Sequence, residues 1–167
     1  MKIEFTDLKE EDFELVKEIY NYYVINTTVT FHTDKLTAEE LKKEILTGHP
    51  KYKSFLIKCD GIACGYCYLS QHNKRKAYDR TAELSLYLKP EYSRKGIGKI
   101  SIDKIEEIAR ANGIKNLIGI IAEENIQSIK LMNKCGFEKC AHFKKVGEKF
   151  GRILDVVAYQ KIIDDKL

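Results

Sequence analysis

Proline is scarce in this sequence, with only two among 167 residues, and no serine-rich tract marks a disordered linker. No apolar run approaches the roughly 20 residues that a helix needs to cross a bilayer. The start, MKIEFTDL, has no apolar core of signal-peptide length behind a basic end. We therefore expect one ordered domain over residues 1–167, soluble and cytoplasmic, with no membrane partner.

A strong excess of one charge is also missing. The 29 Lys and Arg residues exceed the 25 Asp and Glu residues by four, and charged residues make up 32% of the chain. The hydrophobic share of 44% is ordinary for a globular protein. This balance argues against a dedicated nucleic-acid-binding face, although local clusters of cations are still able to meet phosphates.

The cysteines and histidines lack the spacing of a disulfide framework or a metal site. Five cysteines is an odd number, which favours reduced thiols. Cys64 and Cys67 form a CxxC pair within a strand-like run, where residues three apart are expected to point to opposite faces. No HxxxH or Cys-His pattern joins the four histidines, so we expect no metal: His32, His49, His72 and His142.

Hydrophobic periodicity predicts the order strand, two helices, three strands, helix, strand, helix and two strands. Asp7 is expected to cap a helix over 8–26, and Thr37 with Glu40 forms a capping box for a helix through Thr47. Asp60-Gly61 predicts a hairpin turn. The remaining strands are expected near 2–7, 80–88, 115–122, 137–146 and 152–162, and the remaining helices near 98–112 and 125–134.

This order indicates the α/β class, of the α+β type, with a mixed and mostly antiparallel sheet of about seven strands flanked by about four helices. In the last helix, Ile126, Ile129 and either Leu131 or Met132 are expected to face inward.

The stretch YSRKGIGKI lies between the strand LSLYL and a helix. Gly96 and Gly98 leave backbone N–H groups free at a helix N-terminus, and Arg94, Lys95 and Lys99 add charge-assisted donors, so the turn suits a diphosphate. The spacing excludes a Walker loop and a Rossmann loop. A tight turn with solvated cations is the alternative.

The same residues resemble motif A of the GNAT acyl-CoA N-acetyltransferases, through Arg94, Gly96 and Gly98 with Lys95 and Ile97 between them. EENIQSIKLMNKCGF is similar to the second signature of that family. NTTVTFHT, AYDRTAELSLYL and VGEKFGRILD are similar to its phosphinothricin acetyltransferase branch, so the resemblance covers nearly the whole chain.

The resemblance implies the GNAT fold, acetyl-CoA as cosubstrate, no other cofactor, and a homodimer. It implies that the pantetheine arm lies along the strand before the glycine turn and that the turn binds the pyrophosphate. The implied cofactor-binding residues are Leu86, Tyr87, Leu88, Arg94, Lys95, Gly96, Ile97, Gly98, Lys99, Asn125 and Ser128.

Only a neutral amine attacks a thioester, and amines are mostly protonated at neutral pH, so a base is needed. By the resemblance, Glu83 is that base and a backbone N–H near Leu86 stabilises the oxyanion. A solvated strand carboxylate is the alternative for Glu83. Met132 stands where many GNAT enzymes have a tyrosine acid, and methionine has no proton to donate, so the acid is unassigned.

Phe31, Arg75 and Tyr78 match acceptor-pocket positions of the branch, although each alone is equally typical of a surface arginine or a core aromatic. Glu148 and Phe150 depart from the branch, and a carboxylate at Glu148 would favour a more cationic acceptor.

We therefore expect an N-acetyltransferase for the primary amine of a small amino-acid-like acceptor, of the phosphinothricin, methionine sulfone or methionine sulfoximine type. The alternatives are a polyamine or protein N-terminal acetyltransferase and a non-catalytic acyl-CoA sensor. No nucleic-acid partner is expected.

Overall fold

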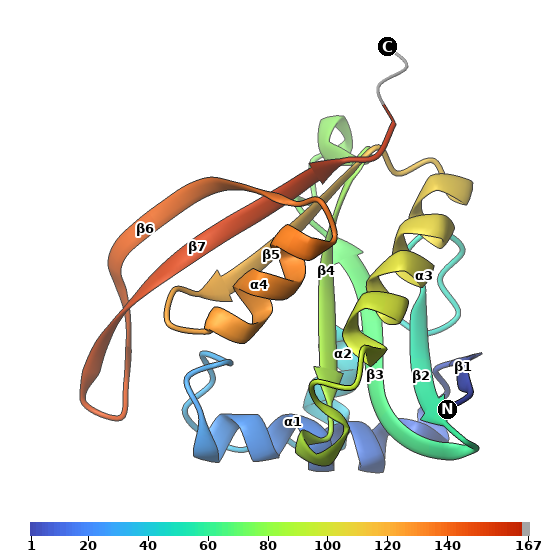
Figure 1. Cartoon of the computed structure of the whole chain (residues 1–167), viewed down its shortest axis with the longest axis horizontal. Coiled ribbons are helices and arrows are strands. Elements are labelled where there is room, and N and C mark those ends of the chain that lie inside the picture. The colour runs from blue at the N-terminus through green and yellow to red at the C-terminus, as the bar shows by residue number, and fades with distance from the viewer. Residues whose placement is uncertain (165–167) are drawn as a thin grey trace.

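A computed structural model describes residues 1–164 of the chain (Figure 1). The order of the elements predicted from periodicity is confirmed. Short 3-10 turns η1, η2 and η3 cover Glu10–Asp12, Lys76–Tyr78 and Pro90–Tyr92. The helices are α1 (Phe13–Asn26), α2 (Ala38–Glu44), α3 (Ile97–Ala111) and α4 (Ile126–Lys134); the strands are β1 (Ile3–Asp7), β2 (Ser54–Cys59), β3 (Ile62–Gln71), β4 (Thr81–Leu88), β5 (Asn116–Ala122), β6 (Glu138–Lys149) and β7 (Arg152–Ile162).

The strands form one seven-stranded sheet in the order β1-β2-β3-β4-β5-β7-β6. Every neighbouring pair is antiparallel except β4 and β5, which run parallel. The expected mixed and mostly antiparallel sheet is therefore confirmed. The parallel pair lies at the centre of the sheet, where α3 connects the two strands.

The helices cover both faces of the sheet. In Figure 1, α3 and α4 lie in front of the sheet and α2 is seen behind β3 and β4. Alternation along each strand supplies one apolar cluster to each face: Ile102 and Ile105 of α3 belong to the larger cluster, and Phe13 and Val16 of α1 belong to the other. No helix within residues 1–164 combines the length and the apolar character needed to cross a bilayer.

Local signals set most of the boundaries. The hydroxyl of Thr37 accepts from the N–H of Glu40, and the Glu40 carboxylate accepts from the N–H of Thr37, which confirms the capping box. Asp60 and Gly61 both have positive φ, 50° and 82°, at the hairpin turn between β2 and β3. Asp7 as a helix cap is wrong, because β1 continues through this residue and α1 begins only at Phe13.

The predicted opposite orientation of Cys64 and Cys67 is also wrong. The register of β2 with β3 passes from Lys58–Ala63 to Ile57–Gly65, so Cys64 is an extra residue that interrupts the alternation. Both cysteines are fully buried in the same apolar cluster as free thiols, and burial raises the pKa of Cys64 to about 11. In residues 1–164 no three His, Cys, Asp or Glu side chains group as metal ligands.

Candidate functional site

The centre of the site is an opening between β4 and β5. The two strands pair only from Thr81–Glu83 to Asn116–Ile118, and Figure 1 shows them diverging beyond that point. The N–H of Lys89 donates to the carbonyl of Cys64, which makes Leu88 and Gly65 a non-hydrogen-bonded pair of the β3–β4 ladder. By alternation, the backbone groups of Leu86 and Leu88 point away from β3 and toward the opening. This edge of β4 is therefore free for an extended ligand.

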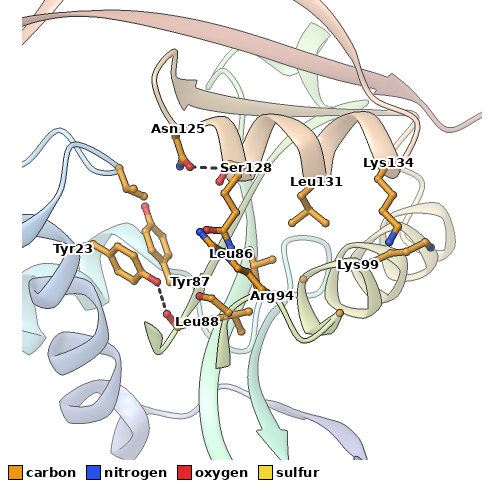
Figure 2. Close-up of a pocket in the computed structure, with 15 residues that line it drawn as sticks. Tyr23, Leu86, Tyr87, Leu88, Arg94, Lys99, Asn125, Ser128, Leu131 and Lys134 are labelled. Carbon is orange, nitrogen blue, oxygen red and sulfur yellow. Dashed lines mark hydrogen bonds between the residues drawn. The ribbon is translucent and has the colours of Figure 1, made fainter. Parts of the chain in front are cut away.

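A cavity of about 280 Å³ lies over this edge, between the glycine turn and α4 (Figure 2). Nine of the residues expected to bind the cofactor line it: Leu86, Tyr87, Leu88, Arg94, Gly96, Gly98, Lys99, Asn125 and Ser128. The structure thus brings the strand before the turn, the turn itself and the start of α4 around one space. The lining residues that were not expected to bind the cofactor are Tyr23, Val29, Ser93, Gln127, Leu131 and Lys134.

The glycine turn presents a helix N-terminus to the cavity. Arg94 and Gly96 have positive φ, 61° and 83°, and Gly96 is the N-cap residue of α3 without a side-chain cap. The first-turn N–H groups of α3 are therefore donors for an anion. The side chain of Ile97 is fully buried and Lys95 lies over the ring of Tyr92, 5.1 Å from Nζ to the ring centroid, so these side chains do not line the cavity.

One end of the cavity is cationic. Figure 2 shows Lys99 of α3 and Lys134 of α4 reaching toward each other there, with Arg94 on the adjoining wall. Lys99 also pairs with Asp103 at 2.5 Å, and this hydrogen bond raises the pKa of Lys99. A cation from each helix, together with the N-terminus of α3, makes this end suited to a phosphate group.

Gly98 permits the close approach of α3 to α4. A Cβ atom at Gly98 would lie 2.8 Å from Cδ2 of Leu131 and 3.7 Å from Cδ2 of Leu86. Both leucines line the cavity. The second glycine of the motif is thus needed for the shape of the cavity wall rather than for an unusual backbone angle.

The opposite end of the cavity is lined by the N-terminus of α4. The side chain of Asn125 caps α4 by accepting from the N–H of Ser128 at 3.2 Å, shown as a dashed line in Figure 2. Both residues also border a smaller cavity of about 100 Å³ between the diverging strands. Ile126 follows Asn125 and is 52% exposed, so its predicted inward orientation is wrong.

Met132 lines the smaller cavity and is buried. A Cβ atom on Gly119 of β5 would lie 1.9 Å from Cε of Met132, so the thioether occupies the space that a side chain at position 119 would need. Leu86 and Ser85 of β4 lie on the same cavity. The residue at the expected acid position is therefore in place, but it has no proton to donate.

Tyr23 of α1 reaches the same opening from the other face of the sheet. Its hydroxyl donates to the carbonyl of Leu88 (Figure 2). Burial raises the pKa of Tyr23, which keeps the hydroxyl protonated as a donor. The bond occupies the Leu88 carbonyl and leaves the backbone groups of Leu86 for a ligand.

Glu83 lies on the α1–α2 face of β4. Leu84, Leu86 and Leu88 pack with the α3 cluster whereas Tyr87 packs with the α1 cluster, so alternation places Glu83 on the same face as Tyr87. Its Oε1 lies 2.9 Å from Nδ1 of His72, and about a third of the surface of each side chain is exposed. Sequence reasoning excluded His72 as a metal ligand and missed this contact.

The residues expected at the acceptor pocket lie on two separate loops. Arg75 and Tyr78 are at η2, where the ring of Tyr78 lies 5.9 Å from that of His72. Phe31 follows α1, and a Cβ atom on Gly147 of β6 would lie 3.7 Å from its ring. Within residues 1–164 no hydrogen bond or ring contact joins Phe31 to the η2 residues.

The β6–β7 hairpin presents a lysine, rather than a glutamate, to the loop after α1 that carries Phe31. Nζ of Lys149 donates to the carbonyl of Thr30 at 2.8 Å, and Lys149 is 2% exposed. Since Gly147 and Lys149 face the loop, alternation turns Glu148 to the other side, where it is exposed. Phe150 is 56% exposed at the hairpin turn. The expected carboxylate in the acceptor pocket is not supported by this geometry.

Comparison with known proteins gives one family for these features. Residues 6–158 match the family model described as an acetyltransferase (GNAT) domain. The chain is 30% identical to the L-methionine sulfoximine/L-methionine sulfone acetyltransferase of Salmonella typhimurium over 170 residues, covering 99% of this chain and 96% of the relative. It is 29% identical to the phosphinothricin N-acetyltransferase of Streptomyces coelicolor over 157 residues, covering 91% of each chain.

Among solved structures, the fold is similar to that of a GNAT superfamily phosphinothricin acetyltransferase from Sinorhizobium meliloti in complex with acetyl-CoA. The TM-score is 0.90 at 30% sequence identity, and the match covers 97% of this chain and 89% of the other.

Proposed function

The chain belongs to the GNAT acetyltransferase family, in the branch similar to phosphinothricin and methionine sulfoximine acetyltransferases, and we propose that it acetylates the primary amine of a small amino-acid-like acceptor. The proposal treats residues 1–167 as a single catalytic domain. The observation that carries it is the lined cavity on the free edge of β4, with Glu83 on the opposite face of the same strand.

The cavity suits acetyl-CoA as a substrate. The first turn of α3, with Arg94, Lys99 and Lys134, supplies donors and positive charge for a diphosphate. The backbone carbonyl of Leu86 offers an acceptor to an N–H of an extended amide-containing arm, which would lie along this edge in the manner of an added strand. We propose that this arm reaches the smaller cavity near Met132, which places a thioester between β4 and β5.

Chemistry then requires a base and an oxyanion donor. Glu83 lies on the α1–α2 face of β4. We propose that it is the base that removes a proton from the acceptor ammonium, directly or through another group. The N–H of Leu86 is the proposed oxyanion donor, because it points into the opening. The amine nitrogen bonds to the acetyl carbon, the carbon–sulfur bond breaks, and the second amine proton ends on the sulfur. Met132 supplies none of these protons.

Phe31, Arg75 and Tyr78 remain the proposed acceptor residues. Arg75 is exposed and its guanidinium has the fork geometry that binds a carboxylate or phosphinate. A polyamine acceptor is less favoured, because Glu148 faces away from Phe31. The homodimer that the resemblance implies stays a prediction, which light scattering on the purified protein tests.

The test is thiol release from acetyl-CoA by the purified protein with methionine sulfone, methionine sulfoximine, phosphinothricin, common amino acids, spermidine and a short peptide. Release with one of the first three supports the proposal. Release with spermidine or the peptide alone would replace the proposed acceptor class. If no acceptor causes thiol release while calorimetry shows that acetyl-CoA binds, an acyl-CoA sensor would be favoured.

A further inference from the structure

Glu83 and His72 form a pair whose geometry resembles the carboxylate–imidazole half of a catalytic triad. The atoms in contact are Oε1 of Glu83 and Nδ1 of His72, at 2.9 Å. An ionised carboxylate only accepts hydrogen bonds, so Nδ1 carries the proton whenever the imidazole is neutral. The other ring nitrogen, Nε2, then holds a free lone pair, which is the arrangement that makes histidine a base.

The surroundings of the pair leave Nε2 available. In the part of the chain that the structure describes, Nε2 of His72 has no hydrogen bond, and no lysine or arginine forms an ion pair with Glu83. The exposed fractions of the two side chains, 31% and 33%, leave the pair open to a solute. An acceptor amine or a single water is therefore able to reach the ring.

The groups around the pair come from four elements. Tyr68 of β3 lies within electrostatic range of both Glu83 and Glu44 of α2, and burial raises the pKa of Tyr68, so that hydroxyl is neutral. The ring of Tyr78, at η2, lies beside His72, and the register partners of Glu83 are Ser70 of β3 and Ile118 of β5. Glu44 is the charged group among these, and its carboxylate pairs with Nε2 of His32 at 3.5 Å. The others carry no charge near neutral pH.

We propose that His72 and Glu83 act as a dyad, in which Glu83 orients the imidazole and Nε2 of His72 takes the proton of the acceptor ammonium. This inference rests on the proposed acetyl transfer and refines the assignment of the base. Imidazoles commonly titrate between about pH 5 and 8 and free carboxylates near 4, so an imidazole is better matched to an ammonium at neutral pH.

The proton balance follows from the two ring nitrogens. The ammonium loses one proton to Nε2, and the neutral amine attacks the acetyl carbon of acetyl-CoA. The second nitrogen proton is lost as the carbon–sulfur bond breaks, and it ends on the CoA sulfur. His72 returns to its neutral form by releasing its proton to solvent, and Glu83 stays ionised throughout.

The kinetic test compares His72→Gln with the wild type across pH, using methionine sulfone or the most active amine of the panel. Glutamine keeps a polar side chain of similar reach but does not titrate. We expect kcat/KM for the amine to fall about 100-fold or more, with a changed dependence of kcat/KM on pH and an unchanged KM for acetyl-CoA. An unchanged pH profile in His72→Gln would overturn the dyad while leaving acetyl transfer intact.

His142→Gln is the matched control. His142 also contacts a carboxylate, Asp155, with Nε2 at 2.7 Å from Oδ2, but this pair lies on the β6–β7 hairpin away from the cavity. The control variant should retain the wild-type rate and pH profile. A similar loss in both variants would show that any histidine–carboxylate pair in the fold matters equally, and it would contradict the proposal.

A measurement without turnover separates this inference from the proposed function. In ¹⁵N-labelled protein at about pH 8, the imidazole of His72, identified by its absence in His72→Gln, should show the Nδ1–H tautomer through two-bond ¹H–¹⁵N correlations. Glu83→Ala should abolish that preference. An Nε2–H tautomer in the wild type would overturn the dyad, whatever the outcome of the acceptor panel.

Discussion

Substitution of Gly98 by alanine should weaken acetyl-CoA binding without unfolding the protein. The new Cβ would lie 2.8 Å from Cδ2 of Leu131, whereas carbon atoms in contact prefer about 3.5–4.0 Å. Leu131 must therefore move by about 1 Å, and the space open to it is the cavity that it lines. With ligand bound, that space is filled and the overlap remains.

The expected change in the Kd of acetyl-CoA follows from comparing the cavity with ligand bound and the cavity in the free protein. Overpacking a filled site costs about 1–3 kcal/mol, which corresponds to an increase in the Kd of acetyl-CoA of at least about fivefold. In the free protein, alanine gains about 0.5–1 kcal/mol over glycine within a helix, which offsets the displacement of Leu131. The free energy of unfolding should therefore change by less than about 1 kcal/mol.

Calorimetric titration with acetyl-CoA and urea denaturation measure the two quantities separately. Gly147→Ala is the control, because its Cβ would lie at an ordinary 3.7 Å from Cβ of Leu154, outside the cofactor cavity. An unchanged Kd in Gly98→Ala would refute the placement of acetyl-CoA against Leu131.

Three further outcomes are expected. Lys99→Met should raise the Kd of acetyl-CoA about threefold to tenfold and weaken its dependence on NaCl, because one cation near the phosphates is lost; an unchanged salt dependence in calorimetry would contradict this. Tyr66→Phe should raise the free energy of unfolding by about 1–2 kcal/mol in urea denaturation, because the buried Tyr66 hydroxyl has no hydrogen-bond partner within residues 1–164; a loss of stability would argue against it. Burial lowers the pKa of Lys149, so the unfolded chain binds more protons at this residue, and wild-type stability should rise relative to Lys149→Met from pH 7 to 10. A difference independent of pH would disprove this linkage.

Local patterns were sufficient to predict the elements of the fold. The Thr37–Glu40 box and the Asp60-Gly61 turn each depend on residues within four positions, and the structure confirms both. The failures arise where the backbone departs from a regular period. Cys64 is an extra residue in its strand, and the start of α1 is delayed by a 3-10 turn after β1, so Asp7 has no helix to cap.

The site could be predicted in part for the same reason. The glycine turn and the start of α4 are contiguous motifs, and the resemblance that they carry named most of their cavity-lining residues, although not Ser93 or Gln127. Contacts between residues that lie far apart in the sequence depend on how the elements pair and pack, and local sequence patterns could not predict them. The bond from Tyr23 to Leu88 joins residues 65 positions apart, and the contact of His72 with Glu83 depends on the pairing of β3 with β4.

The most direct test of the central claim is the identity of the product. The purified protein should be incubated with acetyl-CoA that carries ¹³C in its acetyl group and with methionine sulfone, methionine sulfoximine or phosphinothricin, followed by mass spectrometry. The proposed function predicts a labelled acetyl group on the amine nitrogen of at least one acceptor, formed in stoichiometric amounts with free CoA. Unmodified acceptors, in the presence of protein that binds acetyl-CoA, would contradict it.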